Sequence, residues 1–138
     1  MTTGVLVDAG PLVAILNGRD NDHAVCVDVL KSLRRPLVTT WMPVTEAMYL
    51  LDFSVAAQSA LLEMIERGVL KVMSLGTDDL PFVRDLIKKY NDQPMDFADA
   101  TLVHVANRER LHEIFTLDRR DFGIYRLNQN KSFTILPN

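Results

Sequence analysis

Short apolar runs recur along the chain and divide it into alternating segments. Each run is only a few residues long, which is typical of strands buried within a sheet. The first run is unbroken by any polar residue until Asp8, as expected of a central strand covered on both faces. The predicted strands are residues 4–8, 37–40, 69–73, 114–117 and 133–136.

Amphipathic stretches fill the intervals between these runs. Pro11 suits the first position of a helix, Asp22 and Ser54 suit N-caps, and Gly68 suits the stop after a helix. The predicted helices are residues 11–16, 22–35, 43–51, 54–67, 77–90 and a last one that starts at Asp96. Strands that alternate with helices predict an α/β fold, a three-layer α/β/α sandwich around a mostly parallel sheet of four to five strands, with residues 1–138 forming a single domain.

The last predicted helix has a narrow apolar stripe along one side, which indicates that it lies against the sheet. At about 100° per residue, Asp99 falls about 90° from the centre of the stripe and Asp96 about 150° away. Asp99 is therefore expected to face along the buried surface. Asp96 is expected to face outward as the N-cap, with a role in a functional site as the alternative. The stripe consists of Ala98, Thr101, Leu102, Val105 and Ala106.

The composition is that of a globular protein. The chain has 138 residues, of which 48% are hydrophobic and 24% charged, so it is long enough for a substantial core. No apolar run is long enough to cross a bilayer, and the N-terminus lacks the pattern of a signal peptide. Cys26 is the only cysteine, which excludes an internal disulfide, favours a reducing compartment and suits an inert core position. We therefore expect a cytoplasmic protein with no membrane partner.

Four acids stand where an α/β fold places ligand-binding side chains. Asp8 ends the first predicted strand and Asp118 follows a later one. Asp99 opens the helix that leads to that later strand, and Glu46 lies early in the helix after the second strand. Because ligands of parallel sheets bind at the carboxyl ends of the strands, we expect these acids to converge there. The alternative is chance placement, since the chain has 18 Asp and Glu residues.

Convergence of these acids would favour a divalent cation. Carboxylates within about 4–6 Å of one another raise each other's pKa and destabilise a fold unless a cation neutralises them. Ligand sets made only of oxygen favour Mg²⁺ or Mn²⁺ over Zn²⁺, and His23, His104 and His112 share no metal-ligand spacing. The net charge of −3 argues little for nucleic-acid binding, but two divalent ions would add four positive charges.

The sequence around these acids resembles the PIN-domain ribonucleases, and among them the VapC-type toxins of bacterial toxin–antitoxin pairs. The matching contexts are Val-Leu-Val-Asp8-Ala-Gly-Pro, Val-Thr-Glu46-Ala, Asp99-Ala-Thr-Leu-Val-His and Thr-Leu-Asp118-Arg-Arg-Asp121-Phe, between about residues 5 and 122. The resemblance implies a parallel sheet flanked by helices, bound Mg²⁺ or Mn²⁺ and cleavage of RNA. It maps the family's metal-binding and catalytic acids onto Asp8, Glu46, Asp99 and Asp118. One departure is Ala9-Gly10, where family members often have Ser or Thr, so this chain lacks a hydroxyl that could contact the metal-site water or the substrate.

The implied reaction is metal-assisted hydrolysis of an RNA phosphodiester bond by one or two bound ions. Glu46 would serve as a further metal ligand or would orient the attacking water. Arg119 or Arg120, which directly follow an acid of the site, would bind a flanking phosphate. The implied partners are the RNA substrate, a small antitoxin protein that inserts a segment across the acidic site, and a second copy of the chain in a homodimer.

Three other residues near the acids have two interpretations each. Thr116 is expected to be a strand residue, with the orientation of a carboxylate as the alternative. Asp121 either supports the metal ligands from behind or caps the turn before Phe122. Trp41 is expected to pack in the interior, with stacking on a base as the alternative.

Other protein classes fit the sequence less well. A non-catalytic PIN-like module that binds RNA or a protein through the same scaffold is the main alternative, and a metal titration separates the two. No Gly-x-Gly-x-x-Gly follows the first strand, and no P-loop occurs. A haloacid-dehalogenase-type phosphotransferase would need Asp where Gly10 stands, and a response-regulator receiver would need Asp where Ser74 follows the third strand.

Overall fold

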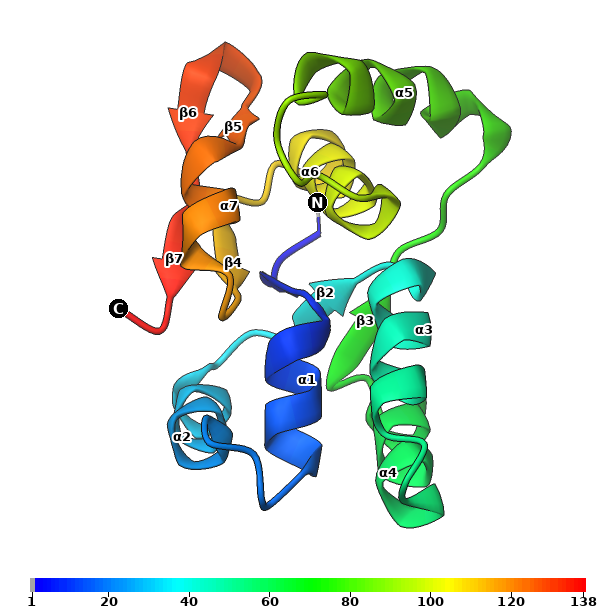
Figure 1. Ribbon diagram of the computed structural model, residues 1–138, viewed down its shortest axis with the longest axis vertical. Helices are drawn as coiled ribbons and strands as arrows, with labels where there is room; N and C mark the ends of the chain where they lie inside the picture. The colour runs from blue at the N-terminus through cyan, green and yellow to red at the C-terminus, as the bar shows by residue number, and fades with distance from the viewer. Residues whose placement is uncertain (1) are drawn as a thin grey trace.

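A five-stranded sheet forms the middle layer of the computed structural model, which describes residues 2–138 (Figure 1). Its strands are β1 (Val5–Val7), β2 (Leu37–Thr39), β3 (Leu70–Val72), β4 (Glu113–Phe115) and β7 (Thr134–Leu136). They lie in the order β3-β2-β1-β4-β7, and every neighbouring pair is parallel. The predicted α/β sandwich is confirmed, and β1 occupies the centre of the sheet.

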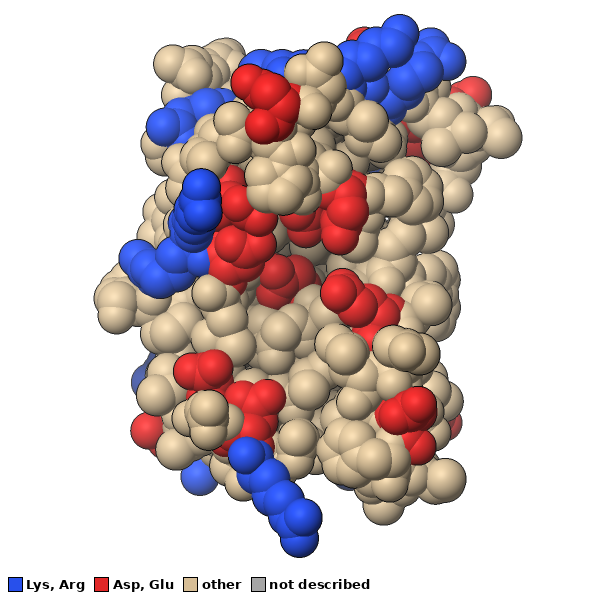
Figure 2. Space-filling view, in the orientation of Figure 1, with Lys and Arg blue, Asp and Glu red and all other residues tan. Residues whose placement is uncertain are grey.

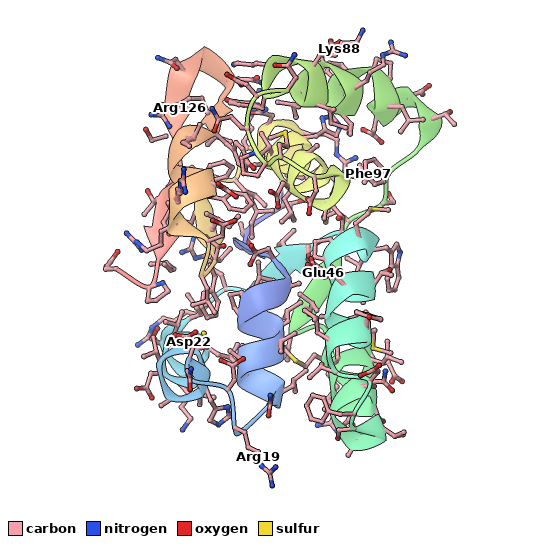
Figure 3. All side chains as sticks on the ribbon, viewed as in Figure 1. Arg19, Asp22, Glu46, Lys88, Phe97 and Arg126 are labelled. Atoms are coloured by element: carbon pink, nitrogen blue, oxygen red, sulfur yellow. The ribbon has the colours of Figure 1, made fainter. Side chains whose placement is uncertain are left out.

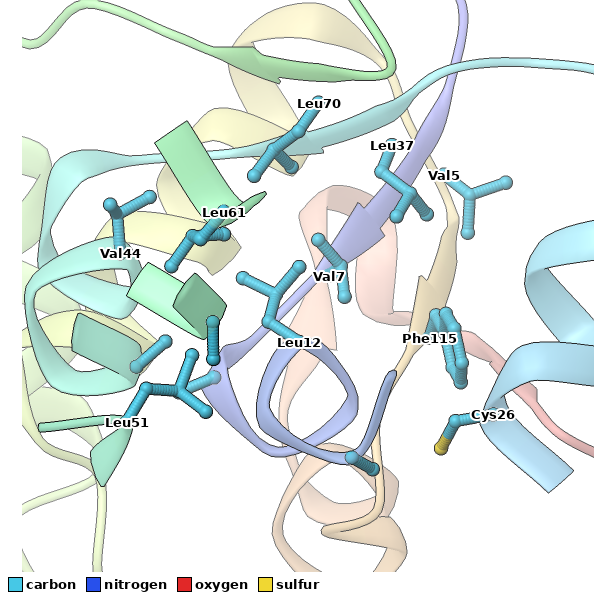
Figure 4. Packing of buried hydrophobic residues seen from close by; sticks show 14 residues of the cluster. Val5, Val7, Leu12, Cys26, Leu37, Val44, Leu51, Leu61, Leu70 and Phe115 are labelled. Atoms are coloured by element: carbon cyan, nitrogen blue, oxygen red, sulfur yellow. The ribbon is translucent and has the colours of Figure 1, made fainter. Parts of the chain in front are cut away.

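Helices cover both faces of this sheet because the side chains of β1 alternate between two cores. Val5 and Val7 point into the core under α1 to α4, and Leu6 points into the core on the side of α5 to α7. Figure 4 shows the first of these cores, which also takes in Cys26, buried as predicted. The helices are α1 (Ala9–Leu16), α2 (His23–Ser32), α3 (Trp41–Leu50), α4 (Val55–Glu66), α5 (Leu80–Lys89), α6 (Phe97–Glu109) and α7 (Arg119–Ile124).

Two of the three predicted helix caps are present. The Ser54 hydroxyl accepts a hydrogen bond from the Ala57 amide at 3.1 Å and begins α4. The Asp96 carboxylate accepts one from the Asp99 amide at 2.7 Å and begins α6, which confirms its role as a cap. Asp22 occupies the N-cap of α2, but its side chain bonds to no amide of that helix, so its predicted capping role is wrong.

The narrow stripe predicted for the last helix is wrong, because α6 is buried on more than one side. Every residue from Ala100 to Ala106 is buried. The helix lies between the sheet and α5 and also contacts α3 (Figure 1). Its polar side chains are satisfied internally: the Thr101 hydroxyl is hydrogen-bonded to that of Thr40 at 2.8 Å, and His104 Nε2 to Asp79 Oδ1 at 2.7 Å.

Several local features differ from the sequence prediction. α1 and α3 each begin two residues before the predicted prolines, and a 3₁₀ turn, η1 (Thr77–Asp79), precedes α5. Trp41 opens α3 with 51% of its surface exposed, so it does not pack in the interior as predicted. The unpredicted elements are α7, the second 3₁₀ turn η2 (Asn128–Asn130) and the antiparallel pair of β5 (Arg126–Leu127) and β6 (Lys131–Ser132). Among residues 2–138, no helix has both the length and the apolar character needed to span a membrane.

Candidate active site

Two neighbouring strands bring acids to the same edge of the sheet. Asp8 follows β1 directly and stands at the N-cap of α1, and Asp118 follows β4 after Thr116 and Leu117. Since β1 and β4 are paired in parallel, with Val7 opposite Phe115, their carboxyl ends lie together. The fold therefore places Asp8 and Asp118 side by side where parallel sheets bind ligands.

Thr116 connects these two acids through its hydroxyl group. The hydroxyl donates to Asp8 Oδ2 at 2.8 Å and accepts from the Asp118 amide at 2.9 Å. Thr116 lies just beyond β4 and is fully buried, so its hydroxyl is held in one place. It is not a residue of the strand itself, and its contact with Asp8 is the alternative that the sequence left open.

Asp8 has an unusual environment for a carboxylate. Its Oδ1 is buried and has no hydrogen-bond partner anywhere in the described part of the chain. Burial, opposed by the Thr116 hydrogen bond and reinforced by the charges of Asp118 and Glu46, raises the pKa of Asp8 from 3.8 to about 7. A buried anionic oxygen without a donor destabilises the fold unless a proton or a cation is supplied.

Asp99 approaches the same place from the first turn of α6. Its Oδ2 accepts a hydrogen bond of 2.9 Å from the buried hydroxyl of Tyr125. Burial is the main cause that raises the pKa of Asp99 to about 7, followed by the charge of Asp96, with smaller contributions from Asp8 and Asp118. Asp99 thus faces along the buried surface, as the helical wheel predicted. It is close enough to the acids at the ends of the strands for their charges to raise its pKa.

Glu46 lies across a cleft from Asp8 and Asp118. The cleft has a volume of about 410 Å³. Figure 3 shows Glu46 on the side of α3 that faces α1 and α6. Partial burial and the charge of Asp96 raise the pKa of Glu46, although its side chain is exposed. The cleft is lined by Asp8, Ala9, Gly10, Glu46, Leu50, Leu117 and Asp118.

The remaining predicted residues surround Asp118. Its Oδ1 accepts from the Asp121 amide at 3.2 Å and caps α7. Asp121 lies inside that helix and caps nothing; burial and Asp118 raise its pKa, and the charge of Arg120 opposes the rise. Arg119 and Arg120 are both exposed, and Arg119 donates a hydrogen bond to the carbonyl oxygen of Pro137. Figure 2 shows acidic side chains gathered in the hollow at the centre of this face, with basic side chains along one side of it.

A family model for the PIN domain matches residues 5–127. The chain belongs to the PIN domain family. Ribonuclease VapC26 of Mycobacterium tuberculosis is 30% identical to it over 135 residues, which are 96% of this chain and 100% of that protein. These findings confirm the resemblance to PIN-domain, VapC-type proteins.

Solved structures share the fold of this PIN domain. The sarcin–ricin-loop-cleaving toxin VapC20 of Mycobacterium tuberculosis superposes with a TM-score of 0.76 at 18% identity, covering 85% of this chain and 92% of that one. A toxin–antitoxin complex from Klebsiella pneumoniae gives a TM-score of 0.66 at 16% identity, covering 88% and 92%. At these identities the likeness concerns the architecture, which is the α/β sandwich described above.

The oxygen atoms of this PIN domain fit a hard divalent cation. The donor set contains only carboxylates, and the buried, unpaired Oδ1 of Asp8 is an open ligand. Within residues 2–138, however, no three Asp, Glu, His or Cys side chains stand close enough to surround an ion by themselves. Mg²⁺ commonly retains several waters and binds through one or two carboxylates plus phosphate oxygens. An ion here would complete its shell in that way.

A second cleft of about 390 Å³ lies between α5 and α6 and shares no lining residue with the acidic cleft. Its wall includes His104 and Asp79, which are hydrogen-bonded to each other. Arg108, also in the wall, donates hydrogen bonds to Asp79 at 3.1 Å and to the Ser74 carbonyl oxygen at 2.9 Å. Because these polar groups satisfy one another, we interpret this cleft as a structural feature of the α5–α6 contact.

Sequence reasoning missed the contact between Tyr125 and Asp99. The two residues are 26 positions apart, and Tyr125 lies in a helix C-cap that was not predicted. Nothing in the spacing of Ile-Tyr-Arg near residue 125 signals a carboxylate partner, so only the fold reveals it.

Proposed function

We propose that this PIN domain is a Mg²⁺- or Mn²⁺-dependent endoribonuclease and the toxin of a toxin–antitoxin pair. The observation that carries the proposal is the buried, unpaired Oδ1 of Asp8 in a cleft shared with Asp118 and Glu46, with Asp99 alongside. The 30% identity to a ribonuclease, VapC26, over nearly the whole chain supports the same reaction class.

The residues of the site have distinct roles in the proposed reaction. Asp8, Asp99 and Asp118 would bind one or two hydrated cations together with oxygens of the RNA phosphate, and Glu46 would bind a cation or orient the attacking water. When bound, the cation would lower the pKa of a bound water and neutralise charge on the scissile phosphate. The Thr116 hydroxyl donates a hydrogen bond to Asp8 Oδ2, so Oδ1 would be the atom that binds the cation. By analogy with the family, the products would carry 5′-phosphate and 3′-hydroxyl ends.

RNA would approach across the rim of the acidic cleft. Of the two arginines proposed to bind phosphate, Arg120 is the better candidate because Arg119 already contacts the Pro137 carbonyl oxygen. Arg120 is exposed and close enough to influence the pKa of Asp121 in the same helix. Its guanidinium would bind a phosphate flanking the cleaved bond. With RNA as its substrate, the protein would act in the cytoplasm.

The cleft is also the proposed docking site of an antitoxin. Leu50 lines the cleft, and the neighbouring side chains of Tyr49, Phe53 and Val55 are 74%, 64% and 78% exposed. A segment carrying apolar side chains and one basic group would match this surface and the adjoining carboxylates. We further expect a homodimer, for which α4 and α5 offer exposed apolar side chains, and light scattering after size-exclusion chromatography would test it.

The test of activity uses purified protein and mixed cellular RNA, with and without Mn²⁺, followed by mapping of the new RNA ends. We expect discrete cuts that require the metal and disappear in Asp8→Asn. Cleavage that persists in excess EDTA would overturn the metal mechanism. Metal binding without cleavage would favour the alternative, a non-catalytic PIN-like module that binds RNA or a protein.

A further inference from the structure

Tyr125 contacts Asp99 from a distant part of the chain. Its hydroxyl donates to Asp99 Oδ2 at 2.9 Å, and its side chain is completely buried. Tyr125 is the C-cap of α7, whereas Asp99 belongs to the first turn of α6. A hydrogen bond between two elements, made by a buried donor, restrains the rotation of the carboxylate that accepts it.

The direction of the Tyr125 hydroxyl is fixed by aromatic packing. Its ring meets Tyr90 edge-on, with centroids 5.2 Å apart and an interplanar angle of 67°. It meets Phe122 in the same way at 5.2 Å and 82°, and Phe122 packs in turn against Phe133 at 5.8 Å. A tyrosine has two side-chain torsions, so contacts on two sides leave its hydroxyl little freedom.

The helix α7 brings this contact and Asp118 together. Asp118 caps the N-terminus of α7, and Tyr125 caps its C-terminus. Six helical residues separate the two caps, a length of about 9 Å at 1.5 Å per residue. Thr116, just before the helix, holds Asp8. The segment 116–125 therefore contacts or supplies three of the four acids.

We propose that Tyr125 is a positioning residue of the nuclease site, which orients Asp99 so that its Oδ1 faces the cation. The inference rests on the proposed function. Tyr125 touches neither RNA nor the reacting atoms; it acts through Asp99. Groups that orient metal ligands in this way typically change metal affinity or activity by about 10–100-fold when removed.

Tyr90 provides a matched control for this role. Its hydroxyl accepts a hydrogen bond from the Arg126 amide at 2.8 Å, and its ring belongs to the same aromatic cluster. It is 7% exposed, close to the burial of Tyr125. Tyr90→Phe and Tyr125→Phe therefore each remove one buried hydroxyl from the same cluster, but only Tyr125→Phe releases an acid of the site.

The test is a Mn²⁺ titration of the whole protein by calorimetry, with cleavage of RNA measured alongside. We expect Mn²⁺ affinity to fall about 10–100-fold in Tyr125→Phe and less than about 3-fold in Tyr90→Phe. The turnover number of Tyr125→Phe should fall at limiting Mn²⁺ and recover at saturating Mn²⁺, where KM for RNA should equal that of the wild type. Equal losses of affinity in the two variants would assign Tyr125 to packing and overturn the inference.

Further outcomes separate this inference from the proposed function. If the wild type binds Mn²⁺ and cleaves RNA, and Tyr125→Phe does both equally well, the proposed role of Tyr125 is wrong but the proposed function stands. If Asp8→Asn binds Mn²⁺ as tightly as the wild type, both proposals are wrong. In an Asp99→Asn background, Tyr125→Phe should cause no further loss of Mn²⁺ affinity. A further loss of Mn²⁺ affinity in the double variant would contradict the inference.

Discussion

A single oxygen atom, Oδ1 of Asp8, sets the energetics of the proposed site. Among residues 2–138 it has no hydrogen-bond donor, although it is buried, and it lies at the carboxyl end of the central strand β1. A deprotonated Asp8 therefore destabilises the metal-free protein, and a bound cation would relieve this penalty. Stability and function are opposed at this residue, as is common where a site must bind charge.

Replacing Asp8 should separate these two effects. Asp8→Asn removes a buried charge, so we expect the metal-free protein to become more stable at pH 8, by about 1–2 kcal/mol. The same change should lower Mn²⁺-dependent cleavage by more than about 100-fold. Urea unfolding in EDTA and initial rates of RNA cleavage are the measurements. A variant that is both less stable and fully active would contradict this account of Asp8.

The Thr116 hydroxyl should matter for activity as well as for stability. Thr116→Val removes the donor to Asp8 Oδ2 and the acceptor of the Asp118 amide, so we expect a loss of stability of about 1–3 kcal/mol. Cleavage should fall about 10–100-fold. Thr39→Val is the control: the Thr39 hydroxyl donates to the Val7 carbonyl oxygen at 2.9 Å and is equally buried. It should lower stability but leave cleavage intact, and equal losses of activity would refute the role of Thr116.

At the scale of elements, alternating apolar runs and amphipathic stretches were sufficient to predict all five strands of the main sheet. The runs are short and fully apolar where strands are central, and the connecting helices begin at recognisable caps such as Ser54 and Asp96. Capping is a local interaction between residues three positions apart, so a sequence displays it directly. The position of Asp99, which depends only on helical periodicity, was predictable for the same reason.

Features that depend on distant neighbours were not predictable. His104 lies on a side of α6 that the predicted stripe would leave exposed, but α5 covers it. Thr101 belongs to the stripe, yet its hydroxyl is hydrogen-bonded to that of Thr40 at the start of α3. Their partners, Asp79 and Thr40, are 25 and 61 residues away. α7 spans only six residues, and its caps, Asp118 and Tyr125, were assigned to other roles or none. Such short elements are stabilised by tertiary contacts rather than by their own periodicity.

The contact between η1 and α6 gives a prediction at this scale. The His104 hydrogen bond, followed by the Gly76 amide, lowers the pKa of Asp79 from 3.8 to about 2. An acid with a lowered pKa contributes stability above its unfolded pKa, and this contribution is lost as the pH falls from about 3.8 to about 2. Asp79→Asn should therefore destabilise the protein at pH 7, by about 1–3 kcal/mol, and by progressively less toward pH 2.

Urea titrations at pH 7, 4, 3 and 2 would measure this difference, with the exposed neighbour Asp78→Asn as the control. Because the contact involves no residue that lines the acidic cleft, RNA cleavage at pH 7 and 25 °C should be unchanged in both variants. A constant difference in stability between Asp79→Asn and wild type at every pH would show that the charge of the Asp79 carboxylate is not its origin.

At the scale of the whole molecule, the distribution of charge links metal binding to substrate binding. The net charge is −3, and one group of acids gathers in the central hollow with basic side chains beside it (Figure 2). An RNA phosphate would be repelled by the empty cleft and attracted once divalent cations occupy it. Metal binding should therefore precede RNA binding, and affinity for RNA should depend on Mn²⁺ concentration.

The same clustering predicts how stability depends on pH and metal. Burial and mutual repulsion raise the folded-state pKa values of Asp8 and Asp99 to about 7. The metal-free protein is therefore most stable, with respect to these groups, below pH 3.8, and it loses that stability as the pH rises to about 7.

A cation binds the deprotonated form, so added Mn²⁺ should stabilise the protein strongly at pH 8 and weakly at pH 5. At 100 times its dissociation constant the gain is about 2.7 kcal/mol. Melting temperatures of wild type and Asp99→Asn, with EDTA or Mn²⁺ at both pH values, measure this coupling; a Mn²⁺ shift equal in both proteins, or equal at both pH values, would place the bound ion away from these acids.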